Sequence, residues 1–241
     1  MEKFVFLCCG ILILLGACNR NNRNLSISDE QSFKVSVKGG EEWLHDFPLL
    51  LGIKMRNPPQ LAIWIEDIHG KYLSTVYVTR KIATQSWIMS GGNRRQEALP
   101  HWCYSRGVQY EDGLYLPTKK VPFVDGVSGA TPKGNFEMGL KLSDELTKFV
   151  VKMEVNHSTD FNVYYPQTAE KDDLNYSGGK YGSGQPALVY AARIDLSSGQ
   201  KEYELKLIGH SSPDGTDGEI YADVSSLTTA LNIVERIVVY F

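Results

Sequence analysis

The feature that most constrains the fold is a succession of short β-type segments separated by turn residues. Residues 33–37 alternate apolar and polar side chains, and residues 61–67 and 72–79 flank a turn at His69 and Gly70. Such alternation is typical of strands with one face on a core and the other in water. Further predicted strands, separated by turn residues, occur at residues 136–142, 149–155, 186–195, 203–208 and 236–241. Because no helices alternate with these strands, the sequence predicts an all-β protein, an immunoglobulin-like antiparallel β-sandwich with one or two short helical segments.

The regions between these strands give weaker predictions. Residues 83–106 mix helix formers with large aromatic residues and predict a short helix or a packed loop, in which Trp87 and Trp102 cover an open end or edge of the sheet. Residues 161–165 and 219–223 predict brief strands, and residues 225–234 predict a helical turn. The glycine-rich stretch 177–184 lacks the spacing of a phosphate-binding loop and predicts a surface loop.

The N-terminus has the pattern of a secretory signal. Lys3 precedes an apolar run at residues 4–15, which ends in Gly16, Ala17 and Cys18. The run is shorter than the roughly 20 residues that a membrane-spanning helix needs. The pattern resembles a bacterial lipobox, which implies a signal peptide at residues 1–17 and a lipidated Cys18 anchored to a membrane leaflet. The alternative is an uncleaved signal anchor.

We expect an Asn-rich flexible tether at residues 18–31 and a single β-sandwich domain at residues 32–241. The formal net charge is only −3, so the composition gives no indication of nucleic-acid binding. Cys8 and Cys9 leave with the predicted signal and Cys18 is predicted to be lipidated, so Cys103 has no partner for an internal disulfide. Cys103, between Trp102 and Tyr104, is predicted to be a buried small hydrophobic residue and not a nucleophile.

One short stretch suggests chemistry. Residues 125–131 read Asp-Gly-Val-Ser-Gly-Ala-Thr, and this string resembles the acceptor motif on which bacterial flavin transferases attach FMN. The resemblance implies that FMN is joined through its phosphate to the hydroxyl of the last residue. The residues that carry the resemblance, and that are the predicted cofactor-binding residues, are Asp125, Ser128, Gly129, Ala130 and Thr131.

Local features bear on this hypothesis in both directions. Pro132 biases Thr131 toward an extended conformation, so we expect the Thr131 hydroxyl to point outward. However, flavin-carrying domains commonly have a further hydroxyl residue after the motif, whereas Pro132 follows it here. Those domains are also mixed α and β, whereas this chain is predicted to be all-β. The alternative is a tight connection in which Gly126 and Gly129 adopt positive φ and Asp125 bonds the turn backbone.

A broader resemblance runs from about residue 59 to residue 241. It rests on residues 62–67 with Gly70, residues 97–100 with Trp102, the 125–131 motif and residues 183–186. In these segments the chain resembles a family of predicted periplasmic bacterial proteins of unknown function that is associated with flavin transferases. The resemblance implies an immunoglobulin-type sandwich in an envelope redox setting.

Two other site types were considered. His210 lies near Asp214, Asp217 and Glu219, a spacing that permits calcium ligation, although an Asp- and Gly-based hairpin turn is favoured. The five histidines show no close metal-ligand spacing, and no serine lies in a nucleophile context. The sequence therefore predicts neither catalytic residues nor a metal site.

The sequence leads to two hypotheses of different class. The first is a membrane-anchored extracytoplasmic lipoprotein that carries covalent FMN, or assists envelope electron transfer, with a flavin transferase and membrane redox proteins as partners. The second is a non-catalytic binding or assembly module of the cell envelope, with Trp64, Trp87 and Trp102 as contact residues. Both place the protein at a membrane surface facing the periplasm or the cell exterior.

Overall fold

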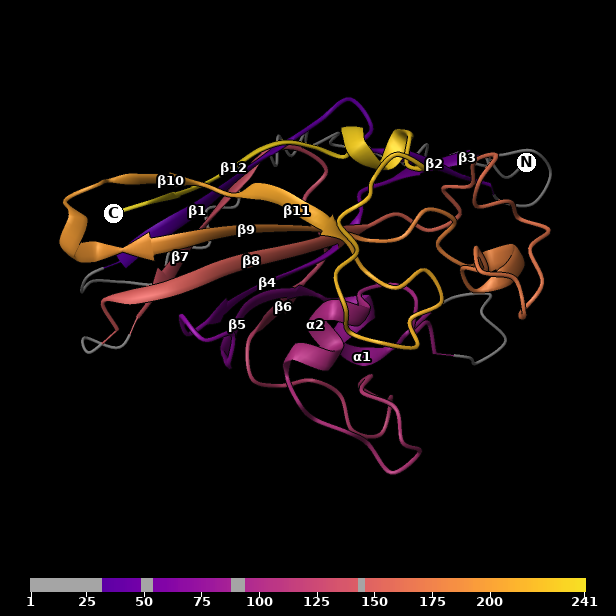
Figure 1. Cartoon of the computed structure of the whole chain (residues 1–241), viewed down its shortest axis with the longest axis horizontal. Coiled ribbons are helices and arrows are strands. Elements are labelled where there is room, and N and C mark those ends of the chain that lie inside the picture. The colour runs from indigo at the N-terminus through magenta and orange to yellow at the C-terminus, as the bar shows by residue number, and fades with distance from the viewer. Residues whose placement is uncertain (1–31, 49–53, 88–93, 143–145) are drawn as a thin grey trace, which may run out of the picture.

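The computed structural model describes residues 32–48, 54–87, 94–142 and 146–241, which form a β-sandwich (Figure 1). The strands are β1 (Ser32–Gly39), β2 (His45–Pro48), β3 (Lys54–Asn57), β4 (Gln60–Glu66), β5 (Tyr72–Thr79), β6 (Val127–Gly129), β7 (Phe136–Lys141), β8 (Lys148–Asn156), β9 (Leu188–Asp195), β10 (Glu202–Glu204), β11 (Lys206–His210) and β12 (Val234–Tyr240). The α-helices are α1 (Arg80–Thr84) and α2 (Pro100–Ser105), and short 3-10 turns occur at Gly179–Tyr181, Leu196–Ser198 and Thr229–Asn232. The predicted signal peptide, Cys18 and the tether lie outside the described residues.

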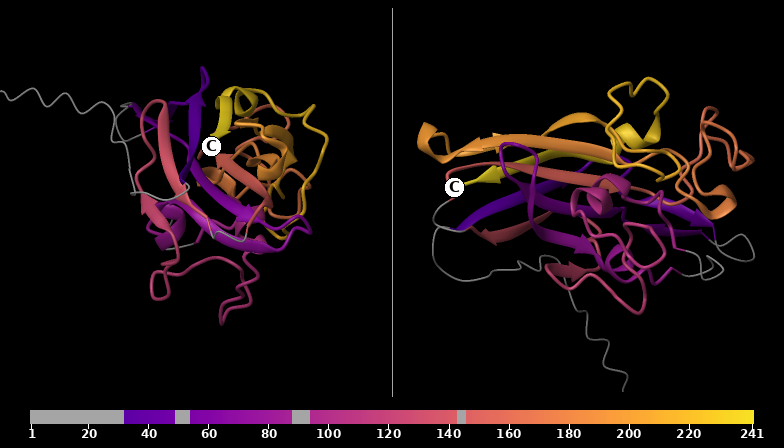
Figure 2. Two further views of the ribbon diagram at one scale, coloured as in Figure 1. Left: turned by 90° about the vertical axis from the view of Figure 1, so that its left-hand side faces the viewer. Right: turned by 60° about the horizontal axis from the view of Figure 1, so that its bottom comes forward.

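The strands form two stacked sheets and one small ribbon. The larger sheet has the order β11-β9-β8-β4-β5-β6, the smaller has the order β10-β12-β1-β7, and β2 pairs with β3. The end-on view in Figure 2 shows the two layers wrapping around a common interior. The prediction of an all-β sandwich with two short helices is confirmed; its immunoglobulin-like classification stays a prediction.

One pairing departs from the predicted antiparallel arrangement. β6 runs parallel to β5, with Tyr77 opposite Val127 and Thr79 opposite Gly129, whereas the other paired strands are antiparallel. A parallel neighbour requires a crossover, and the chain makes it through α1, α2 and the long connection that follows α2. The 125–131 segment thus becomes an edge strand of the larger sheet.

The inner core fills the space between the two sheets. Phe33 of β1 packs against Phe149 of β8 and Phe241 at the C-terminus, with ring centroids 5.8 and 5.2 Å away. The side chains of Val35, Val37, Ile63 and Val151 are also fully enclosed in this core. The period-2 alternation of β1 and β7 follows from this arrangement, because one face of each strand meets the core and the other meets water.

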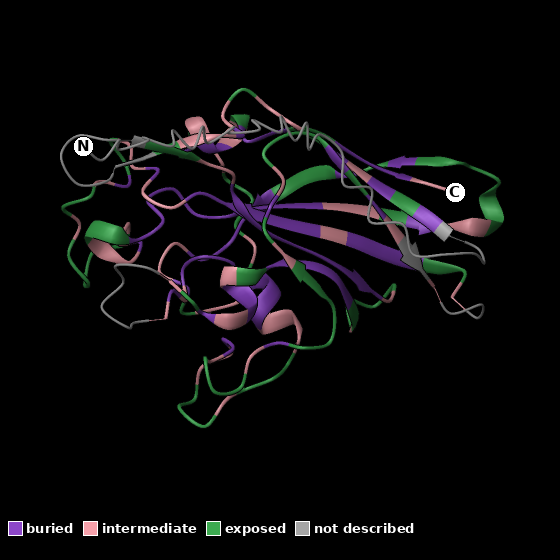
Figure 3. Ribbon diagram, turned by 180° about the vertical axis from the view of Figure 1, so that it is seen from behind, coloured by how far each residue is buried: buried purple, intermediate pink, exposed green. Residues whose placement is uncertain are grey.

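A second apolar layer covers the outer face of the larger sheet. Trp64 of β4 and Trp102 of α2 belong to this outer cluster, together with Ala62, Val78, Ile82, Leu99, Cys103, Phe123 and Val189, and Trp87 packs against it. Every residue of β4 is buried, which Figure 3 shows as a continuous buried strand. The uninterrupted apolar run at residues 61–65 is therefore that of a strand covered on both faces. Trp87 and Trp102 cover a face of the sheet and not the predicted end or edge.

Three strand predictions were inaccurate. Residues 161–165 form a turn, because the Asn162 side chain accepts hydrogen bonds from the backbone N–H groups of Tyr164 and Tyr165. Residues 219–223 contribute only an isolated bridge between Tyr221 and His210. The predicted strand at residues 203–208 is divided, since β10 belongs to the smaller sheet and β11 to the larger.

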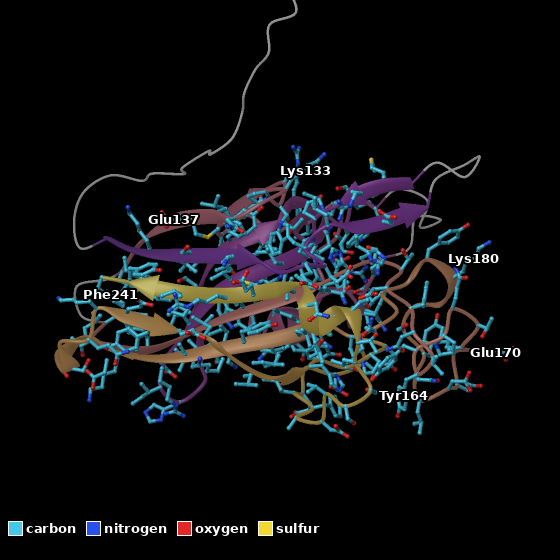
Figure 4. The ribbon with its side chains drawn as sticks, turned by 90° about the horizontal axis from the view of Figure 1, so that it is seen from above. Lys133, Glu137, Tyr164, Glu170, Lys180 and Phe241 are labelled. Carbon is cyan, nitrogen blue, oxygen red and sulfur yellow. The ribbon has the colours of Figure 1, made fainter. Side chains whose placement is uncertain are left out.

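The two ends of the sandwich differ. Lys34 lies opposite Tyr240 in the β1–β12 pair, so the first described residues and the C-terminus share one end. The long connections after β8 gather at the other end, where Figure 4 labels Tyr164, Glu170 and Lys180, far from Phe241. Among the described residues there is no helix that is both long and apolar enough to cross a membrane.

Candidate functional site

The 125–131 segment lies at the free edge of the larger sheet. Asp125, Gly126, Val127, Ser128 and Ala130 are exposed, and Gly129 is half-buried. A side chain at residue 126 would collide with the backbone, because a Cβ there would lie 2.8 Å from the carbonyl oxygen of Thr75. Six of the seven motif residues are thus at least partly exposed to solvent. Gly126 is required because a larger residue would collide with β5.

Thr131 differs from the rest of the motif, because its side chain points inward and only 7% of the residue is exposed. Its Oγ1 lies 2.9 Å from Oγ1 of Thr79, which in turn bonds the backbone N–H and C=O of Leu61. The Tyr77 phenol lies in the same region, and burial raises its pKa to about 12. The expectation of an outward hydroxyl was wrong: Pro132 favours an extended backbone, but the pairing with Thr79 determines which way the side chain points.

The alternative account of the motif as a glycine turn was wrong in its mechanism. Gly126 and Gly129 are not among the glycines with positive φ. Within the described residues, no hydrogen bond joins Asp125 to the turn backbone. What holds the segment is its pairing with β5 and the bond from the Trp43 indole N–H to the carbonyl oxygen of Pro132, at 3.0 Å.

FMN attachment to Thr131 does not fit this arrangement. A transferase would need to reach Thr131 Oγ1, and that atom is enclosed and hydrogen-bonded. Ser128 offers an exposed hydroxyl, and Gly129 and Ala130 are small, as the acceptor motif requires. The folded segment therefore presents the surroundings of an acceptor site without an accessible acceptor atom.

A buried ionic cluster lies under α2, on the outer face of the larger sheet. Lys152 of β8 places Nζ 2.9 Å from Oε2 of Glu66 and 3.1 Å from Nε2 of His101. The other Glu66 oxygen accepts the indole N–H of Trp64 at 2.7 Å. His101 Nδ1 lies 2.6 Å from the carbonyl oxygen of Gly218. These partners define an imidazole that donates from Nδ1 and accepts at Nε2.

His101 is therefore unsuited to act as a general base. Burial and the neighbouring Lys152 ammonium lower its pKa, which keeps the ring neutral. Both ring nitrogens already have protein partners, so neither is available to a substrate. The cluster has the composition of a catalytic site but the bonding of a structural one.

Glu154 is the most deeply buried carboxyl group of this region. It caps α2: its Oε1 accepts from the backbone N–H of His101 at 3.2 Å, and its Oε2 accepts from that of Trp102 at 2.7 Å. Burial raises its pKa to about 7, an effect that the hydrogen bonds from Trp102, Ser211 and His101 only partly offset. The carboxyl group thus compensates for the missing N-cap side chain of α2.

A second polar network joins segments that are far apart in the sequence. Arg95 Nε donates to Glu97 Oε1 at 2.7 Å, and Nη2 donates to Ser183 Oγ at 3.0 Å. Ser183 Oγ in turn donates to Asn156 Oδ1 at 2.7 Å. Gly178 packs against the Arg95–Glu97 ion pair, since a Cβ at that position would be 2.5 Å from Glu97 Oε1. The resemblance segments 97–100 and 183–186 therefore meet in the interior, where they hold the long connection after β8 against the sheet.

The remaining candidates take structural roles. Cys103 is fully buried and its pKa is raised to about 12, which confirms the prediction of a small hydrophobic residue. Trp64 and Trp102 are buried completely and cannot be contact residues, and Trp87 is half-buried. Asp214 accepts from the Ser212 and Thr216 hydroxyl groups, as expected of a turn residue. Among the described residues, no group of three or more His, Cys, Asp or Glu is placed to hold a metal ion.

Sequence reasoning missed the ionic cluster for a specific reason. Lys152 and Glu154 alternate with apolar residues along β8, which is also the signature of a solvent-facing side. The cover provided by α2 comes from a segment about 50 residues earlier in the chain. One sequence signal was Glu66, a charged residue that directly follows the apolar run 61–65 of β4.

Comparison with known proteins provides no relative. No family model, curated protein or solved structure matches the chain. The functional argument therefore rests on the residues of this chain.

The pKa of Glu154 predicts a pH dependence of stability. Its folded pKa of about 7 lies above the ordinary value of 4.5, so the folded state holds this proton more tightly than the unfolded state does. The corresponding stabilisation is complete below pH 4.5 and is lost as the pH rises through 7, a change of roughly 3 kcal/mol. We expect Glu154→Gln to remove this pH-dependent part of the free energy of unfolding, because the amide does not titrate.

Denaturant titrations of both proteins at several pH values measure the effect. The free energy of unfolding of wild type relative to Glu154→Gln should fall between pH 5 and pH 8. The neutral buried histidines His101 and His157 act in the opposite direction, but they are present in both proteins and largely cancel in the difference. A pH-independent difference would contradict the assignment.

The inward position of Thr131 predicts a contrast between two hydroxyl deletions. Thr131→Val removes the bond to Thr79 at nearly constant volume and should lower the free energy of unfolding by about 1 kcal/mol. Ser128→Ala removes an exposed hydroxyl three residues away and should change it by less than about 0.5 kcal/mol. Equal effects in urea unfolding would show that Thr131 is not bonded inside the fold.

Proposed function

We propose that the protein is a non-catalytic binding module of the cell envelope, lipid-anchored through Cys18. The lipobox-like sequence at residues 16–18 and the Asn-rich segment that follows support the anchor and the tether. The bonding of the ionic cluster supports a non-catalytic role, because His101 and Glu154 are both engaged by protein groups. The immunoglobulin-like assignment of the sandwich belongs to the same proposal.

The observation that carries the proposal is the opposition of the two ends. The described chain begins beside the C-terminal strand, and the long loops lie at the far end of the sandwich (Figure 4). A domain tethered by its N-terminus would present those loops away from the membrane. Loops on a rigid β-scaffold are where binding residues most often occur.

The lipid anchor is tested by labelling. Cells grown with an alkyne fatty acid should yield a labelled wild-type protein in the membrane fraction. Cys18→Ser should abolish the label, whereas Cys103→Ala, which alters the other cysteine of the predicted mature chain, should retain it. Label that survives Cys18→Ser would refute the anchor.

A covalent FMN carrier is the second candidate, because the exposed edge from Asp125 to Ser128 leaves the acceptor-like motif within reach of a flavin transferase. Against it stands the enclosed Thr131 hydroxyl. Attachment would require Thr131, which lies beyond the end of β6, to lose its hydrogen bond to Thr79 and turn outward. Membrane redox proteins would then be the partners.

Intact-mass measurement separates the two candidates. Protein isolated from its native envelope, and protein co-expressed with a flavin transferase, should both have the unmodified polypeptide mass apart from the lipid. A mass increase of one FMN group that is absent in Thr131→Ala would establish the carrier in place of the binding module.

A further inference from the structure

The connection between β8 and β9 exposes apolar side chains to an unusual degree. Val163 is 100% exposed and Leu174 is 101% exposed, and Tyr164 is more than half exposed. Burial of such side chains is favourable, so their full exposure forgoes a hydrophobic stabilisation. Exposed apolar groups that gather at one place mark interaction sites more often than scattered ones do.

These three residues lie on neighbouring turns at one end of the sandwich, and together they are here called the apolar tip. The Asn175 side chain donates to the carbonyl oxygen of Tyr164, which brings the turn at residues 173–175 against the turn at residues 162–165. The Tyr164 ring also packs edge-on against Tyr165, at 5.0 Å between centroids. The tip therefore combines two aliphatic side chains with one aromatic ring.

The base of the tip is firmly held. Tyr165 is buried, and its hydroxyl lies 3.3 Å from that of Ser226. Asn162 donates to the carbonyl oxygen of Ser226 while its own oxygen closes the turn. Asp160 pairs with Gly184, a glycine whose positive φ and contact with the Asp160 carbonyl exclude a side chain. The protein thus presents its most exposed apolar side chains on a preorganised support, which lowers the entropic cost of binding.

The charges around the tip favour a protein over a lipid surface. Residues 161–182 contain Glu170, Asp172 and Asp173 against Lys171 and Lys180, a net charge of −1. Membrane-inserting surfaces usually carry basic residues that attract anionic lipid, and this segment has the opposite balance. The slight acidic excess of this border instead complements a pocket with a basic rim.

The position of the tip agrees with this choice. The described chain begins at Ser32, beside the C-terminal strand and at the end opposite Tyr164, and the predicted tether of 14 residues, 18–31, precedes it. Fully extended, such a tether spans at most about 50 Å. The nine residues of β8 alone occupy about 30 Å, and loops extend both ends. Insertion of the tip into the anchoring membrane would require the tether to extend back along the sandwich by more than about 30 Å, at a loss of conformational entropy.

We propose that the apolar tip of Val163, Tyr164 and Leu174 is the docking site for a protein partner that offers an apolar pocket bordered by lysine or arginine. This inference rests on the proposed binding function and assigns it a surface and a chemical class of partner. The tip provides the central apolar contact, and Glu170 and Asp172 provide the charged rim.

Site-specific photo-crosslinking in the native envelope tests the inference with the full chain. p-Benzoylphenylalanine is placed at residue 163 or 174, and at residue 121 as the control, because Val121 is also exposed but lies in the connection before β6. Both tip positions should give an adduct with the same protein, identified by mass spectrometry. The yield should exceed that at residue 121 by roughly tenfold, equivalent to about 1.4 kcal/mol of preferential contact.

A charge reversal tests the chemistry of the partner. Glu170→Lys with Asp172→Lys should reduce the adduct several-fold, and two matched exposed reversals away from the tip, Glu111→Lys with Glu137→Lys, should leave it unchanged. An adduct that survives the first reversal would refute the basic rim. Because these side chains are exposed, loss of folding should not account for the result.

The other outcomes separate this inference from the proposed function. Adducts with phospholipid from residues 163 and 174 would show membrane insertion and overturn the docking site. Adducts from residue 121 but not from the tip would overturn the site and leave a binding module with another surface. Absence of a specific adduct from the tip would overturn the inference, and a flavinylated mass would overturn the proposed function independently.

Discussion

Burial of the larger sheet on both faces is the constraint on which the rest of the structure depends. The inner face meets the smaller sheet, and the outer face is covered by α1, α2 and the connection before β6. Polar groups on the outer face of β4 and β8 must therefore be satisfied within the protein. Glu66 pairs with Lys152 and accepts the indole N–H of Trp64. Glu154 accepts from the first backbone N–H groups of α2. The titratable groups of this region are thus bonded within the protein.

The same constraint explains the position of the 125–131 motif. The crossover that covers the sheet returns the chain parallel to β5, and the motif becomes the edge strand. Its small residues suit that edge, where Gly126 must pass close to Thr75. Thr131 lies two residues beyond Gly129, the last paired residue of β6, and its hydroxyl bonds that of Thr79, which also bonds the backbone of Leu61. The segment that resembles an acceptor site is thereby integrated into the sheet. The proposed docking surface, the apolar tip, lies elsewhere, at the end of the sandwich opposite the first described residues.

The sequence predicted the features that depend on local patterns. The β4–β5 hairpin followed from two apolar runs around Gly70, and the burial of Cys103 followed from its aromatic neighbours. What it could not provide were effects that depend on distant segments. Period-2 alternation in β8 cannot distinguish water from the cover supplied by α2, so Lys152 and Glu154 were missed. Pro132 restricts the backbone of Thr131 but does not determine the direction of its side chain. Leu205 lies between β10 and β11, and its backbone N–H bonds Ile237 of β12 in the smaller sheet. The chain then passes to the larger sheet, where β11 begins at the next residue.

The central claim is that α2 holds the outer face of the larger sheet closed, with Glu154 bonded to its first amides. A helix of six residues is unstable on its own, so its amides can resist exchange only through this packing. Hydrogen exchange of the full-length protein measures the closure directly. Peptides that contain His101 to Cys103 should exchange as slowly as those of β8, with opening free energies near that of global unfolding. Exchange at those amides as fast as in the exposed loop at residues 107–113 would show that the cluster opens to solvent, and would contradict the account.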